Sequence, residues 1–550
     1  MKFRELLTLR NLPSLSSNQL LLITVAYLTI TQNLSFFSAV LNSLPTPMGG
    51  QEWRILASTV FAMVTLLTLA LAGFCFPRAQ KPALIVFVLI AAVSSYFMHS
   101  FGTIIDRAMI ANALNTDRKE ASDLLSFDFF SYVLLAGVLP AWIISRVPLY
   151  FERFSVELRR RLALVGVLLG GLIIILFSQY NTLSFWGREN RDVRMYVNPT
   201  APMYAVKETI ADLLPKGPPE PIRVVAADAV RKSTPDAKPL LVVLVVGETA
   251  RAANFGVDGY ARNTTPRLSA IPELINYPHF ESCGTATLES VPCIFSRLNQ
   301  TDFSRKKARG EENLLDIVKR AGIPVIWRDN NAGCMGTCVR TGSISFESEK
   351  DPTLCANGEC HDEILLKDFE TVLPKTAGSA TFLVLHQKGS HGPAYFKRYP
   401  ESARLFKPDC RIESVQRCTR EEVVNAYDNT IVYTDTMLAN LIEQLRSQQD
   451  SVDSVMIYAS DHGESLGENG IYLHGLPRRM APDEQIHIPM MAWFSAHAPA
   501  AFNLDMACVK TASAKPGSHD NLFDTILNLL SIRTTAYKPE QDLFLACQKH

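Results

Sequence analysis

Residues 454–470 read SVMIYASDHGESLGENG, a short apolar run that passes directly into a cluster of polar residues. The apolar part, Ser454–Tyr458, has the length and composition of a buried strand. Asp461 and His462 follow, where the chain leaves the predicted sheet. In open α/β sheets, ligands bind beyond the carboxyl ends of the strands. This stretch therefore predicts both an α/β fold and the edge at which its site lies.

The alternation of apolar runs and helical segments continues on both sides of this stretch. Such alternation is typical of a mostly parallel sheet with helices on both faces. The sequence therefore predicts an α/β/α domain over residues 238–550. Its further strands are expected at Leu240–Val246, Pro324–Trp327, Thr381–Leu385 and Pro489–Trp493, and its helices include Leu314–Ala321 and Glu421–Ser447.

Two more of these predicted strands end in polar residues. Glu248 follows the run at 241–246, and a polar stretch from His386 to Gly392 follows the run at 381–385. Glu248, Asp461 and His462 would supply two carboxylates and an imidazole, which is a donor set that suits zinc. An isolated Asp-His pair is more often a surface or capping feature, but polar clusters at three strand ends favour a metal site.

A hydroxyl nucleophile is expected in the segment 284–290, which reads GTATLES and lies between Cys283 and Cys293. Zinc with three protein ligands keeps a fourth position open, and a hydroxyl there can be activated for attack on phosphorus. Spacing does not choose between Thr285 and Thr287. A helix cap is the alternative role for either side chain.

Cysteine is almost confined to the C-terminal half, since ten of the eleven lie beyond residue 280 and Cys75 lies in an apolar run. An even number there predicts disulfides formed in an oxidising compartment. Free thiols or a zinc cluster are the alternative, although Cys334 and Cys338 have no second Cys/His pair at zinc-finger spacing. With Cys75 free, neighbouring cysteines give the expected bridges: Cys283–Cys293, Cys334–Cys338, Cys355–Cys360, Cys410–Cys418 and Cys508–Cys547.

The N-terminal third predicts a transmembrane domain of five helices over residues 1–180, because a span needs about 20 apolar residues. Loop Lys and Arg number ten on the side of the N-terminus and four on the other. The N-terminus is therefore expected in the cytoplasm, and the cysteine-rich half in the periplasm of a bacterial inner membrane. The formal net charge is zero, so nothing points to nucleic acid. The expected spans are 19–41, 55–76, 82–101, 128–149 and 162–180.

Two connecting segments complete the predicted organisation. Residues 181–237 contain five prolines between 215 and 235 and are expected to form a linker with short helices on the membrane surface. The loop Ile104–Phe127 carries Asn112, Thr116 and Glu120 at four-residue spacing, so they would share one face of a helix. On spacing alone, this face is interpreted as the solvated side of an amphipathic helix.

Together these motifs resemble the lipid A phosphoethanolamine transferases, the family of the mobile colistin-resistance enzymes, within the alkaline phosphatase/sulfatase-like superfamily. The resemblance covers nearly the whole chain, including the five spans. It rests on the stretches Val246–Arg251, Ser282–Thr287, Ser290–Cys293, Gly389–Pro393, Asp461–Gly470 and His474–Gly475.

The resemblance implies a catalytic zinc ion, tightly bound by Glu248, Thr287, Asp461 and His462, with Thr287 as the nucleophile. A second zinc ion is compatible with it.

Further residues acquire implied roles from the same resemblance. His391 and His474 are implied to line the site, where they bind a second zinc ion or act as acid and base. Asn331 is implied to contact the phosphoethanolamine group. Met335 and Glu289 depart from some relatives, which have a lysine and an aromatic residue at these positions. Three residues are implied to touch the donor lipid: Asn112, Thr116 and Glu120.

The implied reaction has two steps and two lipid substrates. Thr287 attacks the phosphorus of phosphatidylethanolamine, diacylglycerol leaves, and the group passes from the threonine to a lipid A phosphate. Because the added amine lowers the negative charge of lipid A, polymyxin and colistin resistance is expected. The enzyme is expected to be a monomer. The alternatives are transfer to a core sugar, Kdo or a membrane glucan, a periplasmic sulfatase or phosphatase, and a non-enzymatic membrane sensor.

Overall fold

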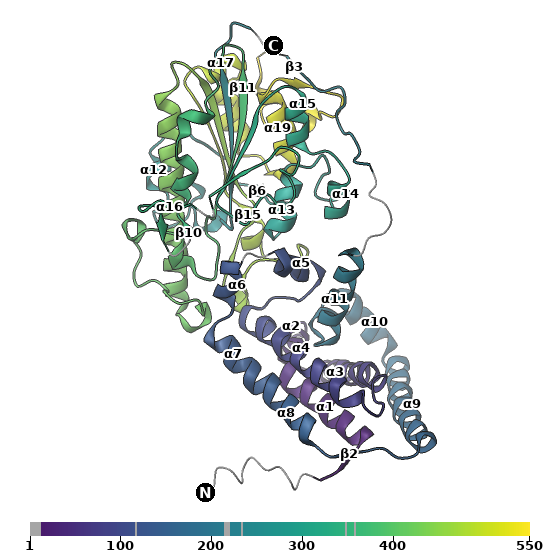
Figure 1. Cartoon of the computed structure of the whole chain (residues 1–550). Coiled ribbons are helices and arrows are strands. Elements are labelled where there is room, and N and C mark those ends of the chain that lie inside the picture. Colours follow the sequence, from purple (N-terminus) through teal and green to yellow (C-terminus); the bar gives the residue numbers. More distant parts are fainter. Residues whose placement is uncertain are drawn as a thin grey trace. The chain divides into compact units, whose positions relative to one another are not determined.

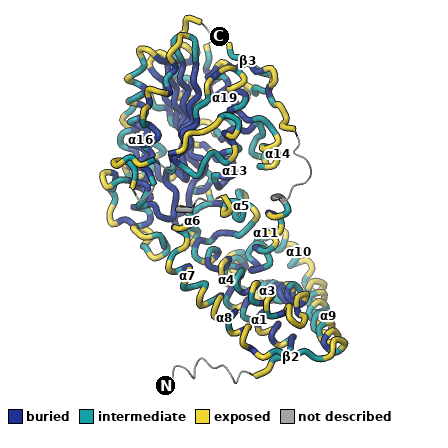
Figure 2. Tube along the Cα trace, in the orientation of Figure 1, coloured by how far each residue is buried: buried dark blue, intermediate teal, exposed yellow. Residues whose placement is uncertain are grey.

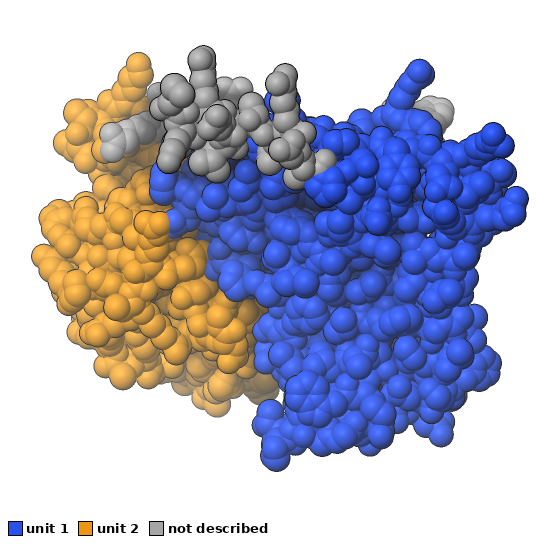
Figure 3. Space-filling model, turned by 90° about the horizontal axis from the view of Figure 1, so that it is seen from below, with its two compact units in different colours: residues 1–114, 124–215 blue, residues 115–123, 216–550 orange. Residues whose placement is uncertain are grey.

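The computed structural model of the protein describes residues 13–115, 118–213, 221–232, 235–346, 349–356 and 359–549. The chain divides into two compact units, shown in different colours in Figure 3. Residues 1–114 and 124–215 form the first, here called the helical unit. Residues 115–123 and 216–550 form the second, here called the sheet unit.

In the part of the helical unit that the structure describes, four helical runs are long and apolar enough to cross a membrane, and a bent pair makes a fifth if it is counted as one span. This agrees with the helical domain predicted from the sequence. Short helices α10 (Tyr180–Glu189) and α11 (Thr200–Leu213) follow the last span. The spans are α3 (Gly50–Ala72), α4 (Gln80–Phe101), the run Phe127–Arg146, α9 (Phe154–Ser178), and the pair α1 (Ser17–Gln32) and α2 (Leu34–Asn42).

The first span, expected as one helix over 19–41, is broken at Asn33, and its two halves meet at 58°. The buried Asn33 amide donates to Leu28 O at 2.9 Å and to Asn198 O at 2.8 Å. Asn198 returns a bond from its backbone N–H to Asn33 Oδ1 at 2.8 Å. Its own amide also donates to Gln32 O at 3.0 Å and to Ala91 O at 2.8 Å. Side-chain amides therefore satisfy backbone groups at the break, which permits a bend inside an apolar span.

The sheet unit is built on a seven-stranded sheet with the order β5-β16-β12-β4-β11-β7-β8. The four pairs from β12 to β8 are parallel, and β16 and β5 add antiparallel pairs at the other edge. The sheet is thus mostly parallel, as the sequence predicts. In sheet order, the strands are β5 (Ile275–Asn276), β16 (Met490–Phe494), β12 (Asp453–Ser460), β4 (Leu240–Gly247), β11 (Ala380–His386), β7 (Val325–Asp329) and β8 (Ile344–Ser345).

The three central strands β4, β11 and β12 are buried along their whole length, which is visible as the dark core in Figure 2. Parallel strands covered on both faces read as continuous apolar runs, which is why the sequence reveals them. The long helix α16 (Arg420–Ser447) lies on one side of the sheet in Figure 1. On the other side lie α13 (Thr287–Ile294), α15 (Leu314–Arg320) and α19 (Leu522–Leu529).

Five disulfides brace the sheet unit, and Cys75 is the free cysteine. The bonded pairs are the neighbours expected from the sequence: Cys283–Cys293, Cys334–Cys338, Cys355–Cys360, Cys410–Cys418 and Cys508–Cys547.

Candidate active site

The register of the central strands brings three potential metal ligands together. Ser460 pairs with Gly247 across the β12–β4 ladder, so the next residues, Asp461 and Glu248, leave the sheet side by side. One ligand atom from each of Glu248, Asp461 and His462 lies within 4.8 Å of the others. All three side chains are completely buried. The strand ends thus form one cluster, as their local sequence suggested.

The free atoms of this cluster fit a metal ion. His462 Nδ1 lies 2.9 Å from Gly463 O, so this nitrogen carries a proton, and Nε2 is the nitrogen that would donate a lone pair to a metal ion in place of its own proton. His462 Nε2 faces Asp461 Oδ2 at 3.3 Å. Asp461 Oδ1 accepts bonds from the backbone N–H groups of Thr249 and His462, at 3.1 and 2.7 Å. Asp461 Oδ2 is buried and has no hydrogen-bond partner among the described residues. Buried acceptors of this kind are typical metal ligands.

The electrostatics of the cluster also favour a cation. Burial raises the pKa of Asp461 to about 6, and the neighbouring Glu248 carboxylate adds to that rise. Burial opposes the charged form of Glu248 too, but the hydrogen bond and charge of His462 hold its pKa well below the usual value. Burial would lower the pKa of His462, whereas Asp461 and Glu248 raise it to about 10. Negative charge is therefore concentrated where a divalent ion would stand.

The backbone beside Glu248 is strained. Thr249 has φ of 59°, a left-handed conformation that a β-branched residue rarely adopts. Tyr427 holds it by donating its hydroxyl hydrogen to Thr249 O at 2.7 Å. Gly389, with φ of 53°, packs so close that a Cβ would lie 2.5 Å from Glu248 O. The Glu248 carboxylate is thus held by a backbone that cannot relax easily.

Of the two threonines in the segment 284–290, Thr287 is the one that contacts this cluster. It begins α13, and its Oγ1 lies 3.2 and 3.1 Å from the two carboxylate oxygens of Glu248 and 3.3 Å from His462 Nε2. Thr285 instead donates to Leu476 O at 2.6 Å. The geometry therefore separates two threonines that the sequence could not.

His519 is a site residue that sequence reasoning missed. Its Nδ1 accepts from the backbone N–H of Cys283 at 3.0 Å, and its Nε2 lies 2.9 Å from Ser460 O. Burial lowers its pKa to about 3, so the ring is neutral, with Nε2 as the donor. It connects the loop before Thr287 to the strand before Asp461. No pattern near residue 519 signals this role.

His391 and His474 lie beside the metal-ligand cluster. The His474 ring centroid is 4.3 Å from that of His462 and 5.3 Å from that of His391. His474 Nδ1 lies 2.8 Å from Glu464 Oε2. Tyr395 donates to the other oxygen of Glu464 at 2.6 Å. Both predicted histidines are therefore at the site, together with a buried carboxylate that the sequence analysis did not single out.

Asn331 lies directly against the Glu248 carboxylate. Its amide donates to Glu248 Oε2 at 2.6 Å and to Gln387 O at 2.9 Å. Its backbone N–H donates to Asp329 Oδ1 at 3.0 Å, and Asp329 Oδ2 lies 3.0 Å from Nδ1 of the buried His386. Asn331 thus orients a potential metal ligand, and the Asp329–His386 pair supports it.

The residues implied to touch donor lipid are only partly described. Asn112 lies on α5 (Arg107–Asn115), and Thr116 lies outside the described residues. Glu120 lies on α6 (Arg118–Leu124), where its side chain is outside the description. The nearby Asp123, which belongs to the sheet unit, pairs with Lys397 at 2.6 Å, and Arg398 Nε donates to His391 O at 3.0 Å.

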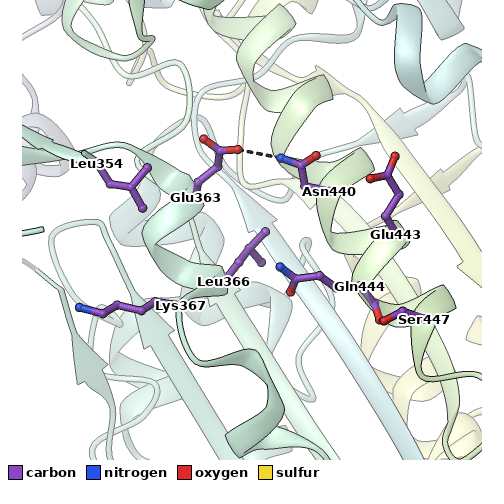
Figure 4. Close-up of a pocket in the computed structure, with 8 residues that line it drawn as sticks. All are labelled: Leu354, Glu363, Leu366, Lys367, Asn440, Glu443, Gln444 and Ser447. Atoms are coloured by element: carbon purple, nitrogen blue, oxygen red, sulfur yellow. Dashed lines mark hydrogen bonds between the residues drawn. The ribbon is translucent and has the colours of Figure 1, made fainter. Parts of the chain in front are cut away.

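A separate groove in the sheet unit lies between α16 and the short helix η5 (Asp362–Leu366) (Figure 4). Glu363 and Asn440 face each other there, and their side chains are joined by a 2.7 Å hydrogen bond. None of the candidate metal ligands lines it. The chemistry of the strand ends therefore does not extend into this groove.

The fold and site define a sulfatase-like enzyme domain attached to membrane-spanning helices. Residues 241–532 match the Sulfatase family. Residues 63–213 match a family described as phosphoethanolamine transferase EptA/EptB.

Proteins that match over nearly the whole chain indicate the same family. Phosphoethanolamine transferase EptA of Escherichia coli K12 is 37% identical over 549 residues, covering 98% of both chains. Phosphatidylethanolamine transferase Mcr-1 of Escherichia coli is 35% identical over 522 residues, covering 93% of this chain and 94% of that one. The solved lipooligosaccharide phosphoethanolamine transferase A of Neisseria meningitidis aligns with a TM-score of 0.92 and 36% identity, over 98% of this chain and all of that one. The chain therefore belongs to the phosphoethanolamine transferase family of membrane enzymes, which confirms the resemblance seen in its motifs.

Proposed function

We propose that this enzyme transfers phosphoethanolamine from phosphatidylethanolamine to a lipid A phosphate through a covalent phosphoethanolamine–Thr287 intermediate at a zinc site. The observation that carries this proposal is the position of Thr287 Oγ1, 3.1 Å from Glu248 and 3.3 Å from His462. The names of two relatives support these substrates. Mcr-1 is named for phosphatidylethanolamine, and the Neisseria enzyme for lipooligosaccharide.

Glu248, Asp461, His462 and Thr287 would hold the zinc ion. Two carboxylates, an imidazole nitrogen with a free lone pair and a hydroxyl suit this metal better than calcium or magnesium, which prefer all-oxygen sites. Bound zinc would supply positive charge that favours the ionised hydroxyl and offsets charge on the phosphoryl oxygens. Among the described residues, Glu248, Asp461 and His462 form one cluster of metal-ligand type. A second zinc ion would need His391 and His474 as ligands.

The side chains of the site account for both transfer steps. Thr287 Oγ1 forms a bond to phosphorus while the bond from phosphorus to the diacylglycerol oxygen breaks. His474 is a suitable proton donor to that oxygen, because Glu464 accepts from its Nδ1–H and stabilises the imidazolium, in which Nε2 also holds a proton and can give it up. His391 is the other candidate. In the second step an acceptor phosphate oxygen attacks the phosphorus, and Thr287 Oγ1 leaves and recovers its proton.

The membrane helices suit this chemistry because both substrates are lipids. We propose a transmembrane domain over 1–180, an interfacial linker over 181–237, and a catalytic domain over 238–550 on the periplasmic side of the inner membrane. The distribution of Lys and Arg and the five disulfides support this orientation. The enzyme is proposed to act as a monomer and to confer polymyxin and colistin resistance.

The test is mass spectrometry of lipopolysaccharide from a strain without its own phosphoethanolamine transferases. Cells expressing the wild-type chain should carry phosphoethanolamine on lipid A and survive higher colistin concentrations, and cells expressing Thr287→Ala should not. Phosphoethanolamine found only on a core sugar, Kdo or a glucan would show that lipid A is not the acceptor. Release of free phosphoethanolamine without any lipid product would show a hydrolase instead.

A further inference from the structure

A short basic helix contacts the helix that begins with Thr287. This helix, α14 (Arg305–Arg309), reads RKKAR and therefore has four cations and no acid in five residues. It packs against α13, and Figure 1 shows the two side by side. The eight residues of α13 make it about 12 Å long, and packed helices lie about 8–10 Å apart. The cations are thus on the order of 20 Å from Thr287, the proposed nucleophile.

Three of these cations face solvent on a well-defined turn. Lys306, Lys307 and Arg309, here called the α14 cations, are exposed, whereas Ala308 is half-buried. Ser304 caps the helix by accepting from the backbone N–H of Lys307 at 3.3 Å. The turn ends at Gly310, whose carbonyl accepts from Arg223 N at 2.8 Å. The cations are therefore presented together by an anchored segment.

Neighbouring acids do not neutralise this charge. Glu311 pairs with Arg223 at 2.6 Å, and Glu312 pairs with Arg320. Among the described residues, Lys306 and Arg309 have no ion-pair partner. Like charges held together raise the local positive potential, which attracts anions and increases the rate of encounter with them.

We infer that the α14 cations bind anionic groups of the acceptor, so that the acceptor is a multiply phosphorylated glycolipid rather than a neutral glucan. This inference rests on the proposed function. The single phosphate of the donor reacts at Thr287, so a second anion site serves the acceptor. One acceptor phosphate attacks the phosphoethanolamine–Thr287 phosphorus while another phosphate of the same head group is held at α14. Arginine grips phosphate with two parallel bonds, and lysine adds point charge.

The test uses the full-length enzyme in vesicles of phosphatidylethanolamine and neutral lipid. The variant is Lys306→Glu/Lys307→Glu/Arg309→Glu. Lys510→Glu/Lys515→Glu, which reverses two other exposed lysines of the sheet unit, is the matched control. Two rates are measured by mass spectrometry: formation of the phosphoethanolamine adduct on the enzyme, and its transfer to added bis-phosphorylated lipid A. Both are repeated with mono-phosphorylated lipid A and at higher salt.

The triple variant should form the adduct within about twofold of the wild-type rate but transfer it to bis-phosphorylated lipid A at least tenfold more slowly. Its transfer should lose most of its salt dependence and its preference for the second phosphate, and the control should match wild type. Unchanged transfer would overturn the inference, as would an equal loss of both steps. If anionic phospholipid in acceptor-free vesicles speeds adduct formation by the wild-type enzyme but not by the triple variant, the cations bind the membrane surface instead. Failure of the wild-type enzyme to form any adduct would refute the proposed function itself.

Discussion

The imidazole of His519 accepts a 3.0 Å hydrogen bond from the backbone N–H of Cys283, 236 residues earlier in the chain. Its other nitrogen donates to Ser460 O at 2.9 Å. The disulfide Cys283–Cys293 closes the loop that carries Thr287, and Ser460 immediately precedes Asp461. One neutral side chain therefore connects the loop that carries Thr287 to the strand that precedes Asp461.

The neutral state of His519 makes stability depend on pH. The folded pKa is about 3, below the ordinary value of 6.5, so the unfolded chain gains a proton below pH 6.5 that the folded chain does not. The contribution of His519 to the free energy of unfolding is therefore fully present above about pH 6.5 and is lost as the pH drops toward 3. At pH 5 the loss from this residue is about 2 kcal/mol.

The variant His519→Gln should lack this pH-dependent contribution to stability. Its thermal unfolding temperature should therefore fall less than that of wild type between pH 7.5 and pH 5. The measurement is thermal unfolding of the full-length enzyme in detergent at both pH values. His487→Gln is the matched control, because His487 also bonds a backbone carbonyl, Pro278 O at 2.7 Å, but is only half-buried. Identical pH dependence in wild type and His519→Gln would contradict the assignment.

Thr287 rather than Thr285 should carry the covalent intermediate. Thr287→Ala removes the hydroxyl that faces Glu248 and His462, so no adduct should form, whereas Thr287→Ser should retain part of the activity. Thr285→Ala loses a buried bond to Leu476 O, which costs about 1 kcal/mol of stability, but should still form the adduct. Peptide sequencing after incubation with phosphatidylethanolamine identifies the modified residue. An adduct on Thr285 would reverse the two roles.

Removal of either buried carboxylate should abolish stoichiometric zinc. Glu248→Gln and Asp461→Asn each leave fewer anionic donors in the cluster, and elemental analysis of the purified protein should find less than one tenth of the wild-type metal. Asp258→Asn is the control: Asp258 Oδ1 accepts from the Asn276 amide, its Oδ2 is buried, and the residue lies outside the cluster. Full zinc occupancy in both ligand variants would rule out this cluster as the metal site.

Asn331 should act on the metal through Glu248. Asn331→Ala removes the 2.6 Å bond to Glu248 Oε2 and should weaken zinc binding by roughly 10- to 100-fold, as is usual for groups that orient a ligand. Asn330→Ala is a neighbouring comparison, since Asn330 bonds Cys360 O and Asp362 and no ligand. Competition with a chelator measures both affinities. Equal zinc affinity in Asn331→Ala and wild type would leave Asn331 with a role toward substrate only.

The sequence could predict those parts of the site that depend on contiguous residues. Glu248 and Asp461 follow fully buried parallel strands, so their apolar runs reveal both the strands and the edge where the carboxylates meet. The choice between Thr285 and Thr287 depends on backbone direction at the start of α13, which residue type does not encode. His519 contributes through a contact made only after the chain has folded, so no local pattern reveals it.

The helical unit shows the same limit. Length and apolarity reveal its spans, but the break at Asn33 requires a partner 165 residues further along the chain. Hydropathy averages over such a residue, since one asparagine hardly changes the mean of twenty neighbours.

The reciprocal bonds between Asn33 and Asn198 also constrain biosynthesis. Asn33 emerges from the ribosome long before Asn198, and all the other spans are made in between. During that interval the Asn33 amide has no native partner at residue 198 in a setting where unsatisfied polar groups are costly. We therefore expect the first span to reach its final bend only after translation has passed the last span.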